Sequence, residues 1–224
     1  MRTSDPPAPN VTTTSGTPSA RSSSSSPSPT IAWASSSASL RIETCGRSVR
    51  SKSASSARGP ERALRRVEWV HVAPLLRDDF APATLERIAY RRRVLLDGHG
   101  LVRPRRVGAL ELDGDFDRSL LRHVSILKLA EEEAQTILGG SELEKLRELG
   151  VPEVVVTFGA GGSLVLTREA AVRVTTRPAR GDPTGAGDAF SVAYLSARAG
   201  GHRPISAARR ASALVSALLS APPR

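Results

Sequence analysis

The sequence predicts an α/β protein with a mostly parallel sheet flanked by helices, confined to residues 67–224. Short apolar runs of strand length alternate there with segments of helical spacing. Such alternation is typical of a parallel sheet whose two faces are covered by helices. Glycine-rich turns follow the runs, and in these sheets ligands bind beyond the carboxyl ends of the strands.

The first part of this region contains three predicted strands and two predicted helices. A strand over 67–72 (VEWVHV) precedes a helix over 82–89, and a second apolar run, 94–97, ends in the carboxylate of Asp97. A third strand over 124–129 leads into a helix over 131–138, which Gly139 and Gly140 end.

The second part continues the pattern and closes with two long helices. The spacing predicts a helix over 141–149, ended by Gly150, and a strand over 154–157. Two runs four residues apart, 164–167 and 172–176, predict an antiparallel hairpin. The chain then predicts helices over 185–199 and 204–219.

Residues 1–66 have a different character. The first 60 residues include 18 serines, and residues 1–66 hold ten basic and three acidic residues without apolar periodicity. Such a segment buries too little surface to offset the backbone entropy of ordering, so we expect it to be disordered, with a domain boundary at 66/67. Four interpretations stay open: a targeting peptide, a basic arm for nucleic acid, an out-of-frame translation of a missing domain, or a solvated tail.

Composition excludes several classes of protein. The formal net charge of +10 comes mostly from this tail, so the predicted domain gives little support to a nucleic-acid partner. Cys45 is the single cysteine, which excludes an internal disulfide framework. No apolar stretch is long enough to cross a bilayer, so we expect no membrane association and take a cytoplasmic location as the default.

The stretch 181–190, GDPTGAGDAF, carries the most chemical information. The small residues Gly185, Ala186 and Gly187 open a helix, where free N–H groups and the helix dipole favour an anion. Asp188 lies in the first turn, and its natural role beside an anion is to accept a proton from a hydroxyl that attacks a phosphoryl group. The alternative is an ordinary glycine-rich turn with a dipole-stabilised aspartate.

The string DPTGAGDAF resembles the C-terminal signature of the PfkB, or ribokinase-like, carbohydrate kinases. The resemblance implies ATP and Mg²⁺ as cofactors and a sugar or sugar-like small molecule as acceptor. It makes Asp188 the catalytic base and Gly185–Gly187 the anion hole. It also implies that Asp182 and Thr184 line the region of the donor phosphates and magnesium.

Two upstream segments match the same family. Thr157, Gly159 and Gly162 fit its T-x-G-x-x-G turn, which packs against the nucleotide; alone, such a turn is more often structural. Glu133 fits the glutamate of its N-x-x-E motif, which orders magnesium through water, whereas Ala130 stands in place of the asparagine. The alternative for Glu133 is a solvated first turn of a helix.

The resemblance covers residues 67–224 only. The Gly-Gly signature, the first strands and the small β lid of the family are not recognisable in this sequence. Two functions therefore stay open: an ATP-dependent sugar kinase, or a truncated, non-catalytic remnant that binds nucleotide at most. Members of the family often dimerise through the lid. Because no lid is recognisable here, a homodimer is possible but the visible sequence does not support it. The four histidines lack metal-ligand spacing, and we expect core or surface roles for them.

Overall fold

The protein forms one nine-stranded sheet in the order β3-β2-β1-β4-β5-β6-β7-β8-β9. The structure, a computed structural model, describes residues 67–79, 81–106, 109 and 111–221, and the backbone of residues 30–35, 40–44 and 47–50. The strands are β1 (Thr30–Ser35), β2 (Leu40–Thr44), β3 (Arg47–Arg50), β4 (Trp69–Ala73), β5 (Arg93–Asp97), β6 (Ile126–Ala130), β7 (Glu153–Thr157), β8 (Ser163–Thr167) and β9 (Ala171–Val174).

The middle of the sheet is parallel, as the sequence predicts. Strands β1, β4, β5, β6 and β7 pair in parallel, and β7, β8 and β9 pair antiparallel. In this register Asp97 lies opposite Lys128 at the carboxyl ends of β5 and β6. Two polar residues from neighbouring strands are thereby brought to the edge where a ligand is expected.

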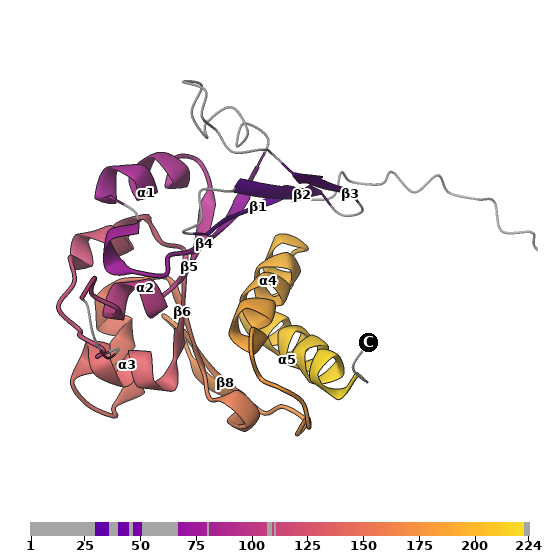
Figure 1. Cartoon of the computed structure of the whole chain (residues 1–224). Coiled ribbons are helices and arrows are strands. Elements are labelled where there is room, and N and C mark those ends of the chain that lie inside the picture. Colours follow the sequence, from indigo (N-terminus) through magenta and orange to yellow (C-terminus); the bar gives the residue numbers. More distant parts are fainter. Residues whose placement is uncertain are drawn as a thin grey trace, which may run out of the picture.

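Helices cover both faces of the sheet (Figure 1). Helices α1 (Pro82–Ala89), α2 (His99–Val102) and α3 (Glu131–Leu138) lie on one face, and α4 (Ala186–Ala199) and α5 (Pro204–Ser220) lie on the other. Alternate strand residues face the two layers: Val70 and Leu127 belong to the core under α1–α3, and Leu95 and Val155 to the core under α4 and α5.

The helix termini explain why these segments fold where predicted. Helix α1 begins with Pro82, which needs no N–H partner at that position, and it buries Leu85 and Ile88. Helix α3 has three glutamates in its first turn, where the helix dipole favours them, and it ends at Gly139 with φ of 65°. Both helices have the bounds expected from the sequence.

Two local features differ from the predictions. The segment predicted as a helix over 141–149 is a 3-10 helix over Leu143–Leu149, because its leucines at 143, 146 and 149 repeat every three residues. The short helix α2 was not expected. It packs closely on the preceding segment, since a Cβ at Gly100 would lie 2.5 Å from the Pro74 side chain.

The amino-terminal strands also depart from the expected disorder. Strands β1–β3 lie within residues 1–66, and β1 adds to β4 in parallel while β2 and β3 continue the sheet antiparallel. The physical reason is the edge of β4, whose unpaired backbone groups offer a template for an added strand. The rest of residues 1–66, including Cys45, lies outside the described residues, and the boundary at 66/67 stays a prediction.

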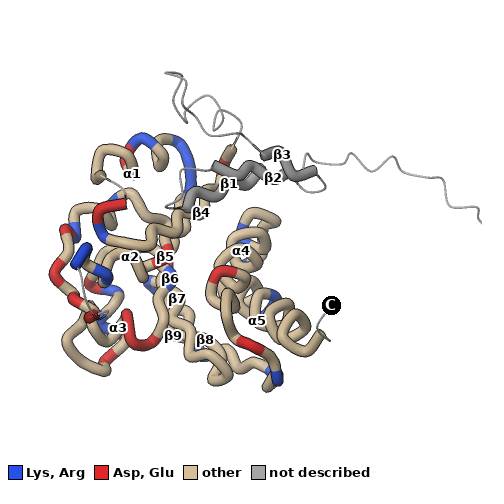
Figure 2. The backbone as a smooth tube through the Cα atoms, viewed as in Figure 1, with Lys and Arg blue, Asp and Glu red and all other residues tan. Residues whose placement is uncertain are grey.

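Charged side chains are distributed unevenly over the two layers (Figure 2). They are frequent on the side of α1–α3 and its loops, and sparse along α4 and α5, which are rich in alanine and serine. Among the described residues, no helix is long and apolar enough to cross a membrane.

Candidate active site

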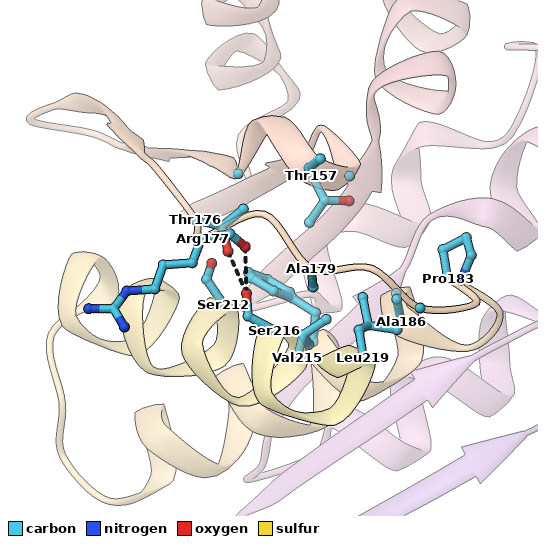
Figure 3. A pocket seen from close by; sticks show the side chains of 16 residues that line it. Thr157, Thr176, Arg177, Ala179, Pro183, Ala186, Ser212, Val215, Ser216 and Leu219 are labelled. Carbon is cyan, nitrogen blue, oxygen red and sulfur yellow. Dashed lines mark hydrogen bonds between the residues drawn. The ribbon is translucent and has the colours of Figure 1, made fainter. Parts of the chain in front are cut away.

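A cavity of about 460 Å³ lies between the β7–β8 turn, the loop before α4, and helix α5 (Figure 3). Five of the residues predicted to bind the donor line it: Thr157, Gly159, Gly162, Ala186 and Gly187. They come from two segments that are separate in the sequence. The fold therefore brings the T-x-G-x-x-G turn and the GAG segment to the same cavity.

The glycine-rich turn after β7 requires glycine for steric reasons. Gly162 has φ of 85°, and a Cβ there would lie 2.1 Å from the carbonyl oxygen of Val174. Thr157, at the end of β7, donates a hydrogen bond from Oγ1 to the carbonyl oxygen of Leu129, 3.2 Å away on the neighbouring strand. The turn is thus held close to β6 and β9, and its backbone forms one wall of the cavity.

The start of α4 is built by a polar turn and a glycine. Asp182 Oδ1 accepts hydrogen bonds from the Thr184 backbone N–H at 3.0 Å and from the Thr184 hydroxyl at 2.7 Å. These hydrogen bonds lower the pKa of Asp182. Gly185 follows with φ of 77°, and the helix begins at Ala186. Asp182 and Thr184 shape the turn but do not line the cavity, whereas Gly181 and Pro183 do.

The opposite wall belongs to α5, which sequence reasoning did not include in the site. Its lining residues lie on one side of the helix: Ser212, Val215, Ser216 and Leu219. The spacing 212, 215, 216, 219 is that of a single helix face, and it was the sequence pattern that could have indicated a contact surface on α5. A Cβ at Gly181 would lie 2.2 Å from the carbonyl oxygen of Leu219, so the loop before α4 needs glycine to approach α5 this closely.

Hydrogen bonds fix the rim of the cavity. The hydroxyl groups of Thr176 and Ser216 lie 3.0 Å apart, and Ser216 also lies 3.0 Å from the carbonyl oxygen of Arg177 (Figure 3). The Arg177 side chain extends away from the other side chains that line the cavity. The inner surface is therefore mainly apolar, with backbone and hydroxyl groups at its edge.

Asp188 lies in the first turn of α4, is exposed, and does not line this cavity. It lines a second groove of about 660 Å³ between α4 and α5, together with residues such as Val192 and Leu214. Asp188 and its neighbours Ala186 and Gly187 thus line different solvent-accessible spaces.

Glu133 has a structural role that the sequence did not predict. Its side chain is buried, and Oε2 accepts a hydrogen bond from the Ala130 N–H at 2.8 Å, which caps α3. Ala130 offers no side-chain cap in return. The described residues contain no group of three or more histidine, cysteine, aspartate or glutamate side chains able to hold a metal ion. If Mg²⁺ binds at this site, Glu133 is the one carboxylate predicted to hold it. The other ligands would come from the donor phosphates, as is common for this ion.

A buried charged cluster lies beneath the start of α4. Asp97 is fully buried, and its carboxylate contacts His71 Nε2 at 2.5 Å, Lys128 Nζ at 3.1 Å and Ser191 Oγ at 3.0 Å. Burial acts to raise the pKa of Asp97, but the His71 hydrogen bond and the charges of Lys128 and His71 prevail and lower the pKa to about 2. Asp97 is therefore a carboxylate at neutral pH. It contacts protein side chains and is not among the residues that line the cavity.

This cluster was only partly foreseen. From the sequence, Asp97 was noted only as the carboxylate that ends a strand, and His71 was given a core or surface role; His71 is buried, 4% exposed. Lys128 and Ser191 were not singled out. The alternation of side chains along β4, β5 and β6 places His71, Asp97 and Lys128 on the face under α4, beside Trp69, Leu95 and Ile126.

Comparison with known proteins identifies the family of this chain. The family described as pfkB family carbohydrate kinase matches residues 48–222. This chain belongs to the PfkB family of carbohydrate kinases. The match begins before residue 67, so the family region extends into the segment that the sequence alone left outside the predicted domain.

One relative is similar in sequence to part of this chain. An ATP-dependent 6-phosphofructokinase from Thermoanaerobacterium thermosaccharolyticum is 34% identical over 87 residues, which cover 37% of this chain and 27% of the relative. The matched segment therefore spans less than a third of that enzyme's length.

Solved structures of ribokinase-family proteins show the fold. One is a pyrophosphate-dependent kinase of that family, complexed with a pyrophosphate analogue and myo-inositol. It has a TM-score of 0.65 at 20% identity, and the match covers 83% of this chain and 67% of the kinase chain. Another is ribokinase from Arabidopsis thaliana, complexed with ribose and ATP. It has a TM-score of 0.57 at 22% identity, and the match covers 72% of this chain and 52% of the ribokinase chain. The predicted ribokinase-like fold is confirmed.

Proposed function

We propose that the protein transfers the γ-phosphoryl group of ATP to a hydroxyl of a sugar or sugar-like acceptor. The observation that carries this proposal is the position of the GAG segment: Ala186 and Gly187 open an α-helix directly onto the cavity, and Asp188 lies in the same turn. Helix N-termini favour phosphate groups through free N–H donors and the helix dipole.

In this mechanism each group acts on a named atom. Asp188 accepts the proton of the acceptor hydroxyl as the oxygen attacks the γ-phosphorus. The new oxygen–phosphorus bond forms while the bond between that phosphorus and the bridging oxygen breaks, and ADP leaves. The amides of Gly185 and Gly187 stabilise the negative charge on the transferred group, since the Ala186 N–H donates to the Pro183 carbonyl oxygen at 2.9 Å. Bound Mg²⁺ would neutralise charge on the donor phosphates, and Glu133 is the residue that would hold it through water.

The cavity supports ATP over pyrophosphate as the donor. It extends from the GAG segment to Val215 and Leu219 on α5, and its surface there is mainly apolar. An adenine ring would bury apolar surface against these side chains, whereas pyrophosphate would leave that part of the cavity empty. Because one structural relative is pyrophosphate-dependent, the donor requires a direct test.

A cavity-filling substitution separates the two donors. Val215→Trp should abolish binding of ATP and preserve binding of inorganic pyrophosphate, because the larger side chain fills the cavity away from the GAG segment. Leu214→Trp is the matched control, since Leu214 is 49% exposed and lines the outer groove instead. Equal loss of ATP binding in both variants, or unchanged ATP binding in Val215→Trp, would contradict the assignment of this cavity to the nucleotide.

One observation favours the second candidate, a non-catalytic protein that binds nucleotide at most. Ala130 provides no polar side chain where the family has asparagine, so the N-cap residue of α3 accepts no hydrogen bond through its side chain. The two candidates differ in one measurable quantity, the release of ADP that depends on an added acceptor. A kinase shows it with at least one sugar, and a remnant binds Mg·ATP without it.

A further inference from the structure

A cavity outside the candidate active site lies at the opposite edge of the sheet. Its volume is about 450 Å³, and it lies where β5, β6 and β7 begin, between the end of α1 and the residues that precede β6 and β7. The candidate active site lies beside the turn after β7, at the carboxyl end of that strand. A cavity of this size is large enough for a small molecule. The mechanism proposed above makes no use of it.

Basic side chains gather around this cavity. Arginines stand at positions 87, 91, 92 and 93, in the last turn of α1, in the turn that follows it and at the first residue of β5 (Figure 2). Arg122 and His123, at the end of the 3-10 helix Arg118–His123, line the cavity from another segment. Among the residues that the structure describes in its lining, Glu86 is the one with an acidic side chain. The local excess of positive charge favours an anionic ligand.

Arg122 is oriented by a neutral partner. Its Nε donates a hydrogen bond to Nε2 of His123, 2.9 Å away, and a histidine nitrogen accepts a hydrogen bond only in the uncharged ring. Within the described part of the chain Arg122 forms no ion pair, although its charge, after the hydrogen bonds from Ser119, helps to lower the pKa of the exposed Asp117. The two Nη groups therefore keep their donors for a ligand, in the planar fork that matches phosphate oxygens.

The turn between α1 and β5 fixes a second cation and an aromatic ring at the same cavity. Arg91 has φ of 59°, a left-handed conformation that costs energy in a residue other than glycine. The turn is held by Arg92, whose N–H donates to the Ala89 carbonyl oxygen at 2.9 Å. Arg92 Nη1 donates to the carbonyl oxygens of Ile88 and Tyr90, each 3.1 Å away. The Tyr90 side chain lines the cavity and is 70% exposed, so its ring offers an apolar surface to a ligand.

We propose that this cavity is a second ligand site, which binds the phosphate group of a small phosphate ester. Arg122 contacts the phosphate oxygens, His123 is a positioning residue that orients Arg122, and the ring of Tyr90 lies against the uncharged part of the ligand. The Ser125 hydroxyl lines the same cavity; its oxygen accepts a hydrogen bond from the Val94 N–H at 3.3 Å, so its own proton is a further donor. The site is separate from the proposed phosphoryl transfer and requires no step of it.

Calorimetric titrations of the full chain with ribose 5-phosphate, glucose 6-phosphate and inorganic phosphate, at constant ionic strength, test this site. Arg122→Met should weaken binding of both esters by about tenfold to a hundredfold, the range expected for one charged hydrogen bond. Arg209→Met is the matched control, because Arg209 on α5 is exposed and lines none of the cavities described above. Val215→Trp, which fills the candidate active site, should leave binding of the esters at this cavity unchanged.

Three further variants separate the roles of the lining residues. Arg122→Lys keeps the charge but loses the fork, so its affinity for the esters should lie between those of the wild type and Arg122→Met. His123→Phe keeps a ring but removes the acceptor, and the loss should be severalfold because Arg122 is no longer oriented. Tyr90→Ala should weaken binding of the esters and spare inorganic phosphate. A purely structural role for these residues would change thermal stability and leave all these affinities as in the wild type.

The outcomes test this site independently of the proposed function. Weaker binding of the esters by Arg122→Met, with Arg209→Met and Val215→Trp like the wild type, supports the second site. An unchanged affinity in Arg122→Met, or an equal loss in Arg209→Met, overturns it, since the second result shows only a general effect of positive charge. A wild type that binds none of the three probes also overturns it. None of these results bears on the release of ADP that depends on an acceptor, which tests the kinase proposal separately.

Discussion

Ser191 on α4 donates a hydrogen bond to the buried carboxylate of Asp97 on β5, 3.0 Å away and 94 positions earlier in the chain. A second buried carboxylate, Glu153 on β7, accepts a hydrogen bond from Tyr194 at 2.6 Å and pairs with Arg198 at 2.9 Å. Helix α4 is thus attached to the sheet at both ends by charged groups. Since the helix carries Asp188 and the GAG amides, these contacts set the position of the candidate active site.

Replacement of the proposed base should abolish turnover and spare donor binding. We expect Asp188→Asn to reduce acceptor-dependent ADP release by about 10²-fold to 10⁴-fold, because the variant keeps the shape of the side chain but cannot accept the proton. The affinity for Mg·ATP should stay close to that of the wild type. Asp78→Asn, at a side chain that is 64% exposed and far from α4 in sequence, is the control. Normal turnover in Asp188→Asn would exclude this residue as the base.

The conformation of Gly185 predicts a cost for any side chain there. Gly185 has φ of 77° and no atom within 4 Å of a built Cβ, so the strain in Gly185→Ala is in the backbone alone. We expect the free energy of unfolding to fall by about 1–2 kcal/mol and donor binding to weaken as the amides shift. Gly140→Ala is the control, because its Cβ is equally unobstructed and its φ is not positive. Similar stability for both variants in urea titrations would contradict this explanation.

Acid should weaken the fold through Asp97. The pKa of this carboxyl is lowered from its ordinary 3.8 to about 2, so the folded state binds the proton less readily than the unfolded chain. The associated stability is fully present above pH 3.8 and is lost as the pH falls toward 2, a change of about 2 kcal/mol. Unfolding in urea between pH 6 and pH 2.5 measures this slope. Asp97→Asn should be less stable at pH 6 and have a shallower slope, and an identical slope would refute the assignment.

The second attachment of α4 predicts an order of effects. Tyr194→Phe removes one hydrogen bond from Glu153, whose carboxylate keeps its contacts with Arg198. We expect a loss of about 1–2 kcal/mol. Arg198→Met removes the cation from a carboxylate that is 5% exposed and should cost more, about 3–5 kcal/mol. Urea denaturation of both variants measures the difference, and the reverse order would contradict this description of the network.

The sequence was sufficient for the elements whose pattern is local. Helix α1 has the predicted bounds because Pro82 and two buried apolar residues determine it within eight positions. The GAG turn and the glycine-rich turn after β7 were predicted from their resemblance to family motifs, and residues of both line one cavity. Glycine at fixed spacing allows the turns that such a motif needs.

The features that the sequence did not predict depend on contacts between segments that are distant in the chain. Lys128 appeared as one residue in an apolar strand, and only the register of β5 and β6 places it opposite Asp97. Strands β1–β3 have weak local signals, and the edge of β4 accounts for their pairing. The spacing of the α5 residues indicates one helix face, but it does not indicate that this face packs beside the turn.

Acceptor-dependent release of ADP by the full chain is the most direct test of the central claim. Mg·ATP is supplied with a panel of sugars, polyols and sugar phosphates, and the wild type is compared with Asp188→Asn. The account predicts that at least one acceptor stimulates ADP release by the wild type and that Asp188→Asn shows no such stimulation while still binding Mg·ATP. Binding of Mg·ATP by the wild type without stimulation by any acceptor would contradict it and favour the non-catalytic alternative.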